Sequence, residues 1–264
     1  MTRPHHATPH LFAHWEQIAR RIHKHRRVVL FLDFDGTLVR IAPMPAGVRL
    51  EEQTREILQN LAHRRNVTLA LVSGRQRAEL QRFVGVHGAR YLGLYGWEKR
   101  GRQRLQFPVR LALARALVEL LVELPGYPGV WIEPKRNSFS VHLLAATAET
   151  QRRMRHRIEE RLKPSRDTLQ VMSNLRDVEV APRNIGDKGV AVRKVLAEPS
   201  LRGALPIYFG DDFSDEPAFA AAAKGIPVLV GKRRATRAKF SLRGPAEVAQ
   251  ALARMGEAIP PARR

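Results

Sequence analysis

The chain has 264 residues, enough for one large or two modest domains, and its lack of cysteine excludes disulfides and thiolate metal sites. Its formal net charge of +21 is compatible with an anionic substrate. No stretch approaches the roughly twenty apolar residues of a membrane span, and the His- and Arg-rich residues 1–27 contain no apolar signal-peptide core. We therefore expect a cytoplasmic protein without a membrane partner.

The first predicted core element is a strand that ends in two carboxylates. The apolar run 28–31 continues into Leu32, Asp33, Phe34, Asp35 and Gly36. Buried parallel strands are continuously apolar, and ligand sites of open α/β sheets lie at their carboxyl ends. One acid can attack an electrophile while the other moves protons, with a metal screening their mutual repulsion. The alternative is an ordinary turn, because Asp and Gly are common turn formers.

A second apolar, β-branched run, 67–72, ends at Ser73, Gly74 and Arg75. A serine hydroxyl and backbone N–H groups at a strand end or helix start suit a phosphate oxygen. The alternative is that Ser73 only caps a helix that starts at Arg75, which is a common role for serine.

The middle of the chain, roughly 106–184, has the pattern of a small inserted domain. An apolar helical pattern runs from Pro108 to the helix-ending pair Pro125-Gly126. An amphipathic helix is expected over 149–163, and strand-like segments are 130–133, 138–144, 168–172 and 177–180. A compact α+β unit of this size, inserted between two core motifs, would act as a lid that excludes water and contributes specificity.

The last part of the chain adds a lysine and an acidic cluster. Lys188 precedes a helical pattern, and the short strand 206–209 ends at Gly210, Asp211, Asp212 and Asp215. Carboxylate oxygens are the ligands that Mg²⁺ prefers. The alternatives are a solvated lysine, and first-turn acids that complement the dipole of a helix over 218–224.

These segments together resemble the haloacid dehalogenase superfamily of phosphohydrolases. The matching motifs are Asp-x-Asp-Gly-Thr at 33–37, Ser-Gly-Arg at 73–75, Lys188, and Gly-Asp-x-x-x-Asp at 210–215. Each motif is weak alone, but the four occur in the order of the superfamily and span most of the chain.

The resemblance implies a role for each of these residues. Asp33 would form an aspartyl-phosphate, and Asp35 would protonate the leaving alcohol and then deprotonate water. Lys188 would offset negative charge, and Ser73 would donate a hydrogen bond to the transferred group. Mg²⁺ would be held by the Asp33 side chain, the Asp35 main-chain oxygen and Asp211, supported by Asp215 or Asp212.

The inserted segment narrows the resemblance to the trehalose-6-phosphate phosphatase family. Residues 133–142 are similar to its Glu-x-Lys-x-x-Ser-x-x-x-His signature, and 210–216 to its Gly-Asp-Asp-x-Thr-Asp-Glu motif. By this resemblance the substrate would be bound by Gly74, Arg75, Glu98, Glu133, Lys135, Ser138 and His142. From the sequence pattern alone, Glu133 and Lys135 are equally consistent with an exposed, charged face of a hairpin. The chain departs from the family pattern at Tyr95, Trp97, Leu144 and Ala181.

We therefore expect an α/β fold: a doubly wound, mainly parallel, Rossmann-like core sheet with a smaller inserted α+β cap domain. The expected parts are core 1–105, cap 106–184 and core 185–264. The expected function is Mg²⁺-dependent hydrolysis of trehalose 6-phosphate, and the nearest alternative is another phosphorylated disaccharide or sugar-like osmolyte.

The positive charge leaves an alternative of a different class, a basic nucleic-acid-associated protein with a non-catalytic core. We do not expect nucleic acid as the partner, because the basic residues are spread along the chain and no nucleic-acid-binding motif accompanies them. The sequence does not indicate an oligomeric state.

Overall fold

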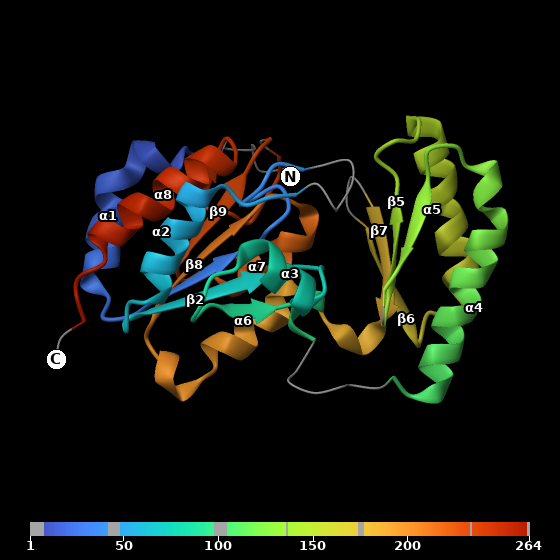
Figure 1. The fold of residues 1–264 in the computed structure, drawn as a ribbon, viewed down its shortest axis with the longest axis horizontal. Coiled ribbons are helices and arrows are strands. Elements are labelled where there is room, and N and C mark those ends of the chain that lie inside the picture. Colours follow the sequence, from blue (N-terminus) through green and yellow to red (C-terminus); the bar gives the residue numbers. More distant parts are fainter. Residues whose placement is uncertain are drawn as a thin grey trace, which may run out of the picture. The chain divides into compact units, whose positions relative to one another are not determined.

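The chain divides into two compact units, which we describe separately (Figure 1). The core unit comprises Met1–Glu98 and Gly186–Arg264, and the insert unit comprises Lys99–Ile185. Within them, the computed structural model describes residues 8–41, 48–97, 105–135, 137–173, 177–232 and 234–262.

The core unit contains a six-stranded sheet of order β10-β9-β8-β1-β2-β3 in which every neighbouring pair is parallel. Its central strands are buried on both faces, which explains their continuous apolar sequence. Register pairs Leu32 with Leu71 on one side and with Phe209 on the other, so three strands end at the same edge. The strands are β1 (Val28–Leu32), β2 (Val67–Val72), β3 (Arg90–Leu92), β8 (Leu205–Gly210), β9 (Ile226–Val230) and β10 (Phe240–Leu242).

Helices cover both faces of this sheet, as a doubly wound fold requires (Figure 1). Successive side chains of β1 point to opposite faces of the sheet. Leu30 belongs to the apolar cluster that includes α1, α2, α3 and α8, and Phe31 belongs to the cluster that includes α6 and α7. The helices are α1 (Trp15–Lys24), α2 (Glu52–Ala62), α3 (Arg77–Val84), α6 (Lys188–Leu196), α7 (Glu216–Ala221) and α8 (Pro245–Ala258).

The insert unit is an antiparallel four-stranded sheet of order β4-β5-β7-β6 with two helices. Phe139, Val141 and Val180 face the helices in a separate apolar core. The alternate residues Ser140 and Glu179 therefore share the opposite face. The elements are α4 (Phe107–Glu123), β4 (Trp131–Pro134), β5 (Phe139–His142), α5 (Ala148–Leu162), β6 (Leu169–Ser173) and β7 (Asp177–Pro182).

Short 3₁₀ turns complete the described secondary structure. They are η1 (Leu11–His14), η3 (Leu94–Gly96), η4 (Leu124–Gly126), η5 (Lys163–Ser165), η6 (Arg183–Ile185), η7 (Pro199–Leu201) and η8 (Phe213–Asp215).

The predicted fold class is confirmed: a mainly parallel core sheet with helices on both faces accompanies a small α+β unit. The unit boundaries lie at 98/99 and 185/186, compared with the expected 105/106 and 184/185. The helix expected over 218–224 begins earlier, at Glu216, because Pro217 is accommodated in its first turn. Within the described ranges, no helix combines the length and apolar character that a membrane crossing needs.

Candidate active site

The site begins where β1 ends. Asp33 is buried, 4% exposed, and its N–H donates to the carbonyl of Phe209 at 3.0 Å, which fixes the carboxyl ends of β1 and β8 together. The turn that follows has Gly36 in the left-handed region, at φ +87°. A Cβ on Gly36 would lie 2.1 Å from Asp211 Oδ2, so only glycine lets that carboxylate approach the turn.

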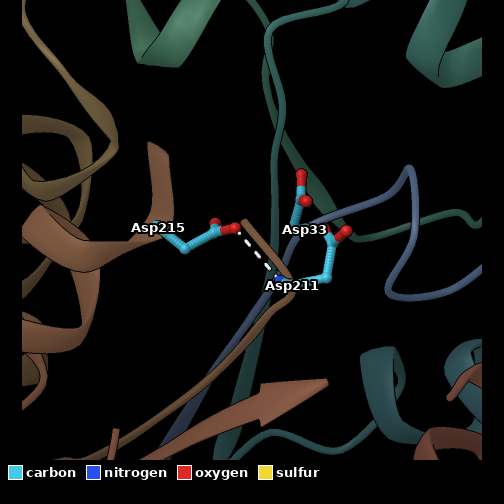
Figure 2. Close-up of side chains that lie close together, drawn as sticks. All are labelled: Asp33, Asp211 and Asp215. Atoms are coloured by element: carbon cyan, nitrogen blue, oxygen red, sulfur yellow. Dashed lines mark hydrogen bonds between the residues drawn. The ribbon is translucent and has the colours of Figure 1, made fainter. Parts of the chain in front are cut away.

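Asp33, Asp211 and Asp215 form an acidic cluster at this edge of the sheet. One oxygen from each carboxylate lies within 4.8 Å of the others. Figure 2 shows the three side chains gathered at the end of β8, with the hydrogen bond that joins Asp215 to the backbone of Asp211. Three carboxylates this close repel one another unless cations lie between them. The cluster therefore has the donor set of a divalent metal site.

Asp215 is the most constrained of the three and is fully buried. Its Oδ2 accepts from the backbone N–H groups of Asp211 at 3.1 Å and Asp212 at 2.9 Å. Its Oδ1 accepts from Lys188 Nζ at 2.8 Å and from the Tyr208 hydroxyl at 2.6 Å. With both oxygens engaged, Asp215 holds the loop after β8 in shape and thereby positions Asp211.

Lys188 is the internal cation of the cluster. It is the first residue of α6, whose N-terminus is capped by the Asp187 side chain accepting from the Val190 N–H at 2.8 Å. Its Nζ lies 2.9 Å from Asp33 Oδ1 and 2.8 Å from Asp215 Oδ1. Burial alone would lower the pKa of Lys188, but the two carboxylates outweigh burial and raise it well above its usual value. Lys188 is therefore an ammonium, not the solvated lysine of the alternative interpretation.

Asp33 and Tyr208 both hold protons more tightly than usual. Burial is the main cause that raises the pKa of Asp33 well above its ordinary value, with Lys188 acting against it. Burial and the charge of Asp215 likewise raise the pKa of Tyr208 well above its usual range, so its hydroxyl stays protonated and donates. Sequence reasoning missed Tyr208; the available signal was a hydroxyl in the otherwise apolar strand 205–209.

The side chain of Asp35 forms an ion pair with Arg75. The guanidinium donates from Nε to Asp35 Oδ2 at 2.6 Å and from Nη2 to Asp35 Oδ1 at 2.7 Å, a bidentate pair. The guanidinium of Arg75 also donates to Glu79 Oε1 at 2.6 Å, and it lies near the rings of Phe34 and Phe83. The substrate-binding role of Arg75 stays a prediction, because its guanidinium is already paired with the carboxylates of Asp35 and Glu79.

Ser73 and Gly74 lie beside this pair. Ser73 is buried, and its Oγ accepts from the Arg75 N–H at 3.1 Å. The alternative that Ser73 caps the next helix is wrong, because α3 begins at Arg77 with Gln76 in the N-cap position. A Cβ on Gly74 would lie 2.8 Å from the hydroxyl of Tyr95. The N–H of Tyr95 donates to the carbonyl of Ser73 at 3.0 Å, so this departure from the family pattern contacts the Ser73–Arg75 loop, and its backbone lies in the left-handed region at φ +58°.

Asp212 has a different position from its acidic neighbours. Its Oδ1 accepts from the Phe213 N–H and caps η8, together with Asp215 in a capping box. Its carbonyl accepts from Arg234 at 2.6 Å. Neither Asp212 nor Asp35 belongs to the cluster of three carboxylates, so their roles as metal ligands stay predictions.

The predicted residues of the insert unit lie on the polar face of its sheet. His142 Nε2 lies 2.9 Å from Glu133 Oε2, and the His142 ring stacks on Trp131 with centroids 3.8 Å apart. Lys135 Nζ donates to Glu179 Oε2 at 2.8 Å. Burial would lower the pKa of Lys135, but the charge of Glu179 outweighs burial and raises it, so Lys135 is an ammonium.

Glu179 is a second residue that sequence reasoning missed. Its Oε2 accepts from Lys135 and Ser140, while its buried Oε1 has no hydrogen-bond partner among the described residues. The same is true, in that set, of the buried Oγ of Ser138. Buried polar atoms of this kind indicate a place where a polar ligand binds. A single acid between Val178 and Val180 gave no signal in the sequence beyond its place in a strand.

The remaining departures lie apart from these contacts. Leu144, where the family pattern has arginine, is 51% exposed, and Ala181 is buried in β7. Trp97 is half-buried after η3. Glu98 lies outside the described residues.

The parallel core sheet and the strand-end site of aspartates and lysine place the chain in the haloacid dehalogenase class. It belongs to the trehalose-phosphatase family, whose family model matches residues 31–246. A trehalose-phosphate phosphatase of Mycobacterium tuberculosis is 33% identical over 242 residues, which cover 85% of this chain and 60% of that protein. The chain thus spans about three-fifths of the length of the curated relatives it matches.

Two solved structures share the fold. The C-terminal domain of trehalose-6-phosphate phosphatase from Candida albicans superposes with a TM-score of 0.82 at 20% identity, over 96% of this chain and 99% of that one. The sucrose-phosphatase of Synechocystis superposes with a TM-score of 0.55 at 22% identity, over 87% of this chain and 98% of that one.

Proposed function

We propose that this chain hydrolyses trehalose 6-phosphate to trehalose and phosphate. The observation that carries the proposal is the close arrangement of Asp33, Lys188, Asp211 and Asp215 at the carboxyl edge of the sheet. Membership of the trehalose-phosphatase family supports the choice of sugar.

The acidic cluster fits Mg²⁺. Its oxygens lie within 4.8 Å of one another, and the missing Cβ of Gly36 leaves room for Asp211 beside the turn. Asp33, Asp211 and the main-chain oxygen of Asp35 would hold the ion, while Asp215, already bonded through both oxygens, would orient the loop. The bound ion would screen the charges of nucleophile and phosphate and polarise the phosphorus.

In the first step an oxygen of Asp33 attacks phosphorus, and the bond from phosphorus to the sugar oxygen breaks. The electron pair leaves with the sugar oxygen, which takes a proton from Asp35. In the second step Asp35 deprotonates a water that attacks phosphorus, and the bond to Asp33 breaks to restore its carboxylate. Lys188 stays charged throughout and offsets the negative charge beside Asp33.

Asp35 can exchange a proton while it stays paired with Arg75. Each of its oxygens accepts one N–H of the guanidinium and keeps a second lone pair for the proton. Glu79 holds another N–H of the same guanidinium. Arg75 would thus orient the general acid while Ser73 donates its hydroxyl hydrogen to the transferred phosphoryl group.

We propose that the insert unit acts as the cap and binds the sugar. The hydroxyl groups of the sugar would be bound jointly by Glu133, Lys135, Ser138 and His142. A polyol needs both hydrogen-bond acceptors and donors, and this set offers both. The buried Oε1 of Glu179, which has no hydrogen-bond partner in the described part of the chain, adds an acceptor on the same face.

A second candidate is another phosphorylated disaccharide or sugar-like osmolyte. The observation that favours it is Leu144, since a leucine that is 51% exposed cannot replace the bidentate contacts of an arginine.

The test is phosphate release from trehalose 6-phosphate, sucrose 6-phosphate and p-nitrophenyl phosphate, each with and without Mg²⁺. The proposal expects metal-dependent turnover that is fastest on trehalose 6-phosphate. The Lys135→Ala variant should lose turnover of the disaccharide phosphate far more than of the aryl phosphate. Equal losses on both substrates would exclude Lys135 as a sugar contact. Turnover of another sugar phosphate alone would favour the second candidate.

A further inference from the structure

Helix α4 of the insert unit is apolar on two opposite faces. Its inner face packs into the insert core through Leu113, Ala116 and Leu120. Its outer face exposes large apolar side chains, including Phe107 at 65% and Val122 at 74%. We call this set the α4 outer stripe; it consists of Phe107, Leu111, Val118, Leu121 and Val122.

The α4 outer stripe is continuous along the helix. At about 100° of rotation per residue its five members fall within an arc of roughly 100°, nearly opposite the inner face. Single exposed apolar residues are ordinary on a protein surface, but a continuous apolar stripe marks a surface that is covered by a partner. The stripe lies away from the sheet face that carries Ser140 and Glu179, so covering it leaves the proposed sugar-binding residues accessible.

Arginines flank the stripe on both sides. Arg110 and Arg115 are exposed and fall immediately beyond its two edges on the helix surface. The guanidinium of Arg110 lies 5.7 Å from the ring centroid of Phe107. An exposed apolar face between cationic side chains that reach the head groups suits a helix that rests against a lipid interface while its other face is held by the protein.

The flanking charges argue against a second copy of the chain as the partner. If two such helices pair antiparallel over the whole stripe, Arg115, which lies near its middle, comes beside Arg115 of the other copy; if they pair parallel, Arg110 lies beside Arg115. Both pairings bring like charges together, between chains that each carry a formal charge of +21. The partner that fits has negative charge beside apolar material.

We infer that the α4 outer stripe binds the surface of an anionic lipid bilayer. The apolar side chains enter the boundary between head groups and acyl chains, and Arg110 and Arg115 contact lipid phosphates. The outer face of a helix is convex, and a bilayer accepts it without a shaped groove. The attachment is peripheral, so it agrees with the lack of a spanning helix in the described part of the chain. The expectation of no membrane partner rested on the absence of a spanning segment and a signal-peptide core from the sequence, and neither feature bears on an interfacial face.

Flotation with vesicles tests the inference. The full chain should float with phosphatidylcholine vesicles that contain phosphatidylglycerol, and not with pure phosphatidylcholine, and salt should reduce the bound fraction. Phe107→Ser/Val122→Ser should reduce the bound fraction at least tenfold, and Arg110→Gln/Arg115→Gln should reduce it on anionic vesicles. The matched control is Val171→Ser, which alters an exposed valine of the same unit on β6. Hydrolysis of p-nitrophenyl phosphate reports that each variant is folded.

A fluorescent label gives a second, local readout. The chain has no cysteine, so Val118→Cys and Val171→Cys each provide a single attachment point for an environment-sensitive dye. Anionic vesicles should shift the emission of the dye at position 118 to the blue and leave the dye at 171 unchanged. Equal shifts at both positions, flotation unaffected by the serine variants, or a dimer in solution that Val122→Ser dissociates would overturn the inference.

Discussion

The hydroxyl of Tyr208 offers the most direct test of how the acidic site is built. Tyr208 is fully buried, and its hydroxyl donates to Asp215 Oδ1 at 2.6 Å. Tyr208→Phe removes this one oxygen and keeps the ring packed against Phe31 and Phe219. The change therefore isolates one hydrogen bond to a buried carboxylate.

The expected loss of stability follows from that bond. A hydrogen bond to a charged group contributes about 1.5–3 kcal/mol. Asp215 retains Lys188 and two backbone donors, so the carboxylate is not left unpaired and we expect about 2 kcal/mol. For a unit of this size, about 2 kcal/mol lowers the melting temperature by roughly 4–8 °C. Because Asp215 orients the loop that carries Asp211, the Mg²⁺ concentration for half-maximal activity should rise about tenfold.

The assay combines thermal unfolding with Mg²⁺ titration of p-nitrophenyl phosphate hydrolysis. The matched control is Tyr91→Phe, since within the described ranges the hydroxyl of Tyr91 is bonded only to the uncharged backbone of Val86, at 2.8 and 2.9 Å. It should lose stability without changing the Mg²⁺ dependence. If Tyr208→Phe leaves both quantities unchanged, or if both variants weaken the Mg²⁺ response equally, the hydroxyl does not organise the site.

Two further substitutions test the geometry around Asp211 and Asp35. Gly36→Ala places a Cβ 2.1 Å from Asp211 Oδ2 and should lower kcat/KM by about 10²-fold, since displacements of this size have such effects. Gly203→Ala, also at positive φ but with no atom within 4 Å, should leave kcat/KM unchanged; an equal loss in both variants would assign the effect to backbone strain. Arg75→Lys cannot form the bidentate pair with Asp35 and should lower kcat about tenfold and move the pH–rate profile, and a profile identical to wild type would show that Arg75 does not orient the general acid.

Much of the fold was predictable because it depends on local pattern. Continuous apolar runs such as 28–32 and 205–209 are what a strand covered on both faces requires, and both are central strands. The order of Asp33, Ser73, Lys188 and Asp211 along the chain was likewise visible, and strand ends of a parallel sheet meet at one edge.

The partners of individual side chains were not predictable. Nothing local to Asp215 indicates that both its oxygens are occupied by groups from β8, α6 and its own loop. The ion pair between Arg75 and Asp35 joins residues 40 positions apart in the sequence, and the ion pair between Lys135 and Glu179 joins residues 44 positions apart. Such contacts depend on tertiary distance and side-chain orientation, which periodicity and propensity do not encode.

The central claim is that Asp33 carries the phosphoryl group. The measurement that tests it most directly is acid quenching of the enzyme during turnover of trehalose 6-phosphate with Mg²⁺, followed by peptide mass spectrometry. The account predicts a phosphoryl group on Asp33 that disappears when substrate is exhausted, and none in Asp33→Asn or without metal. Turnover by Asp33→Asn near the wild-type rate, or a phosphoryl group on another residue, would contradict it.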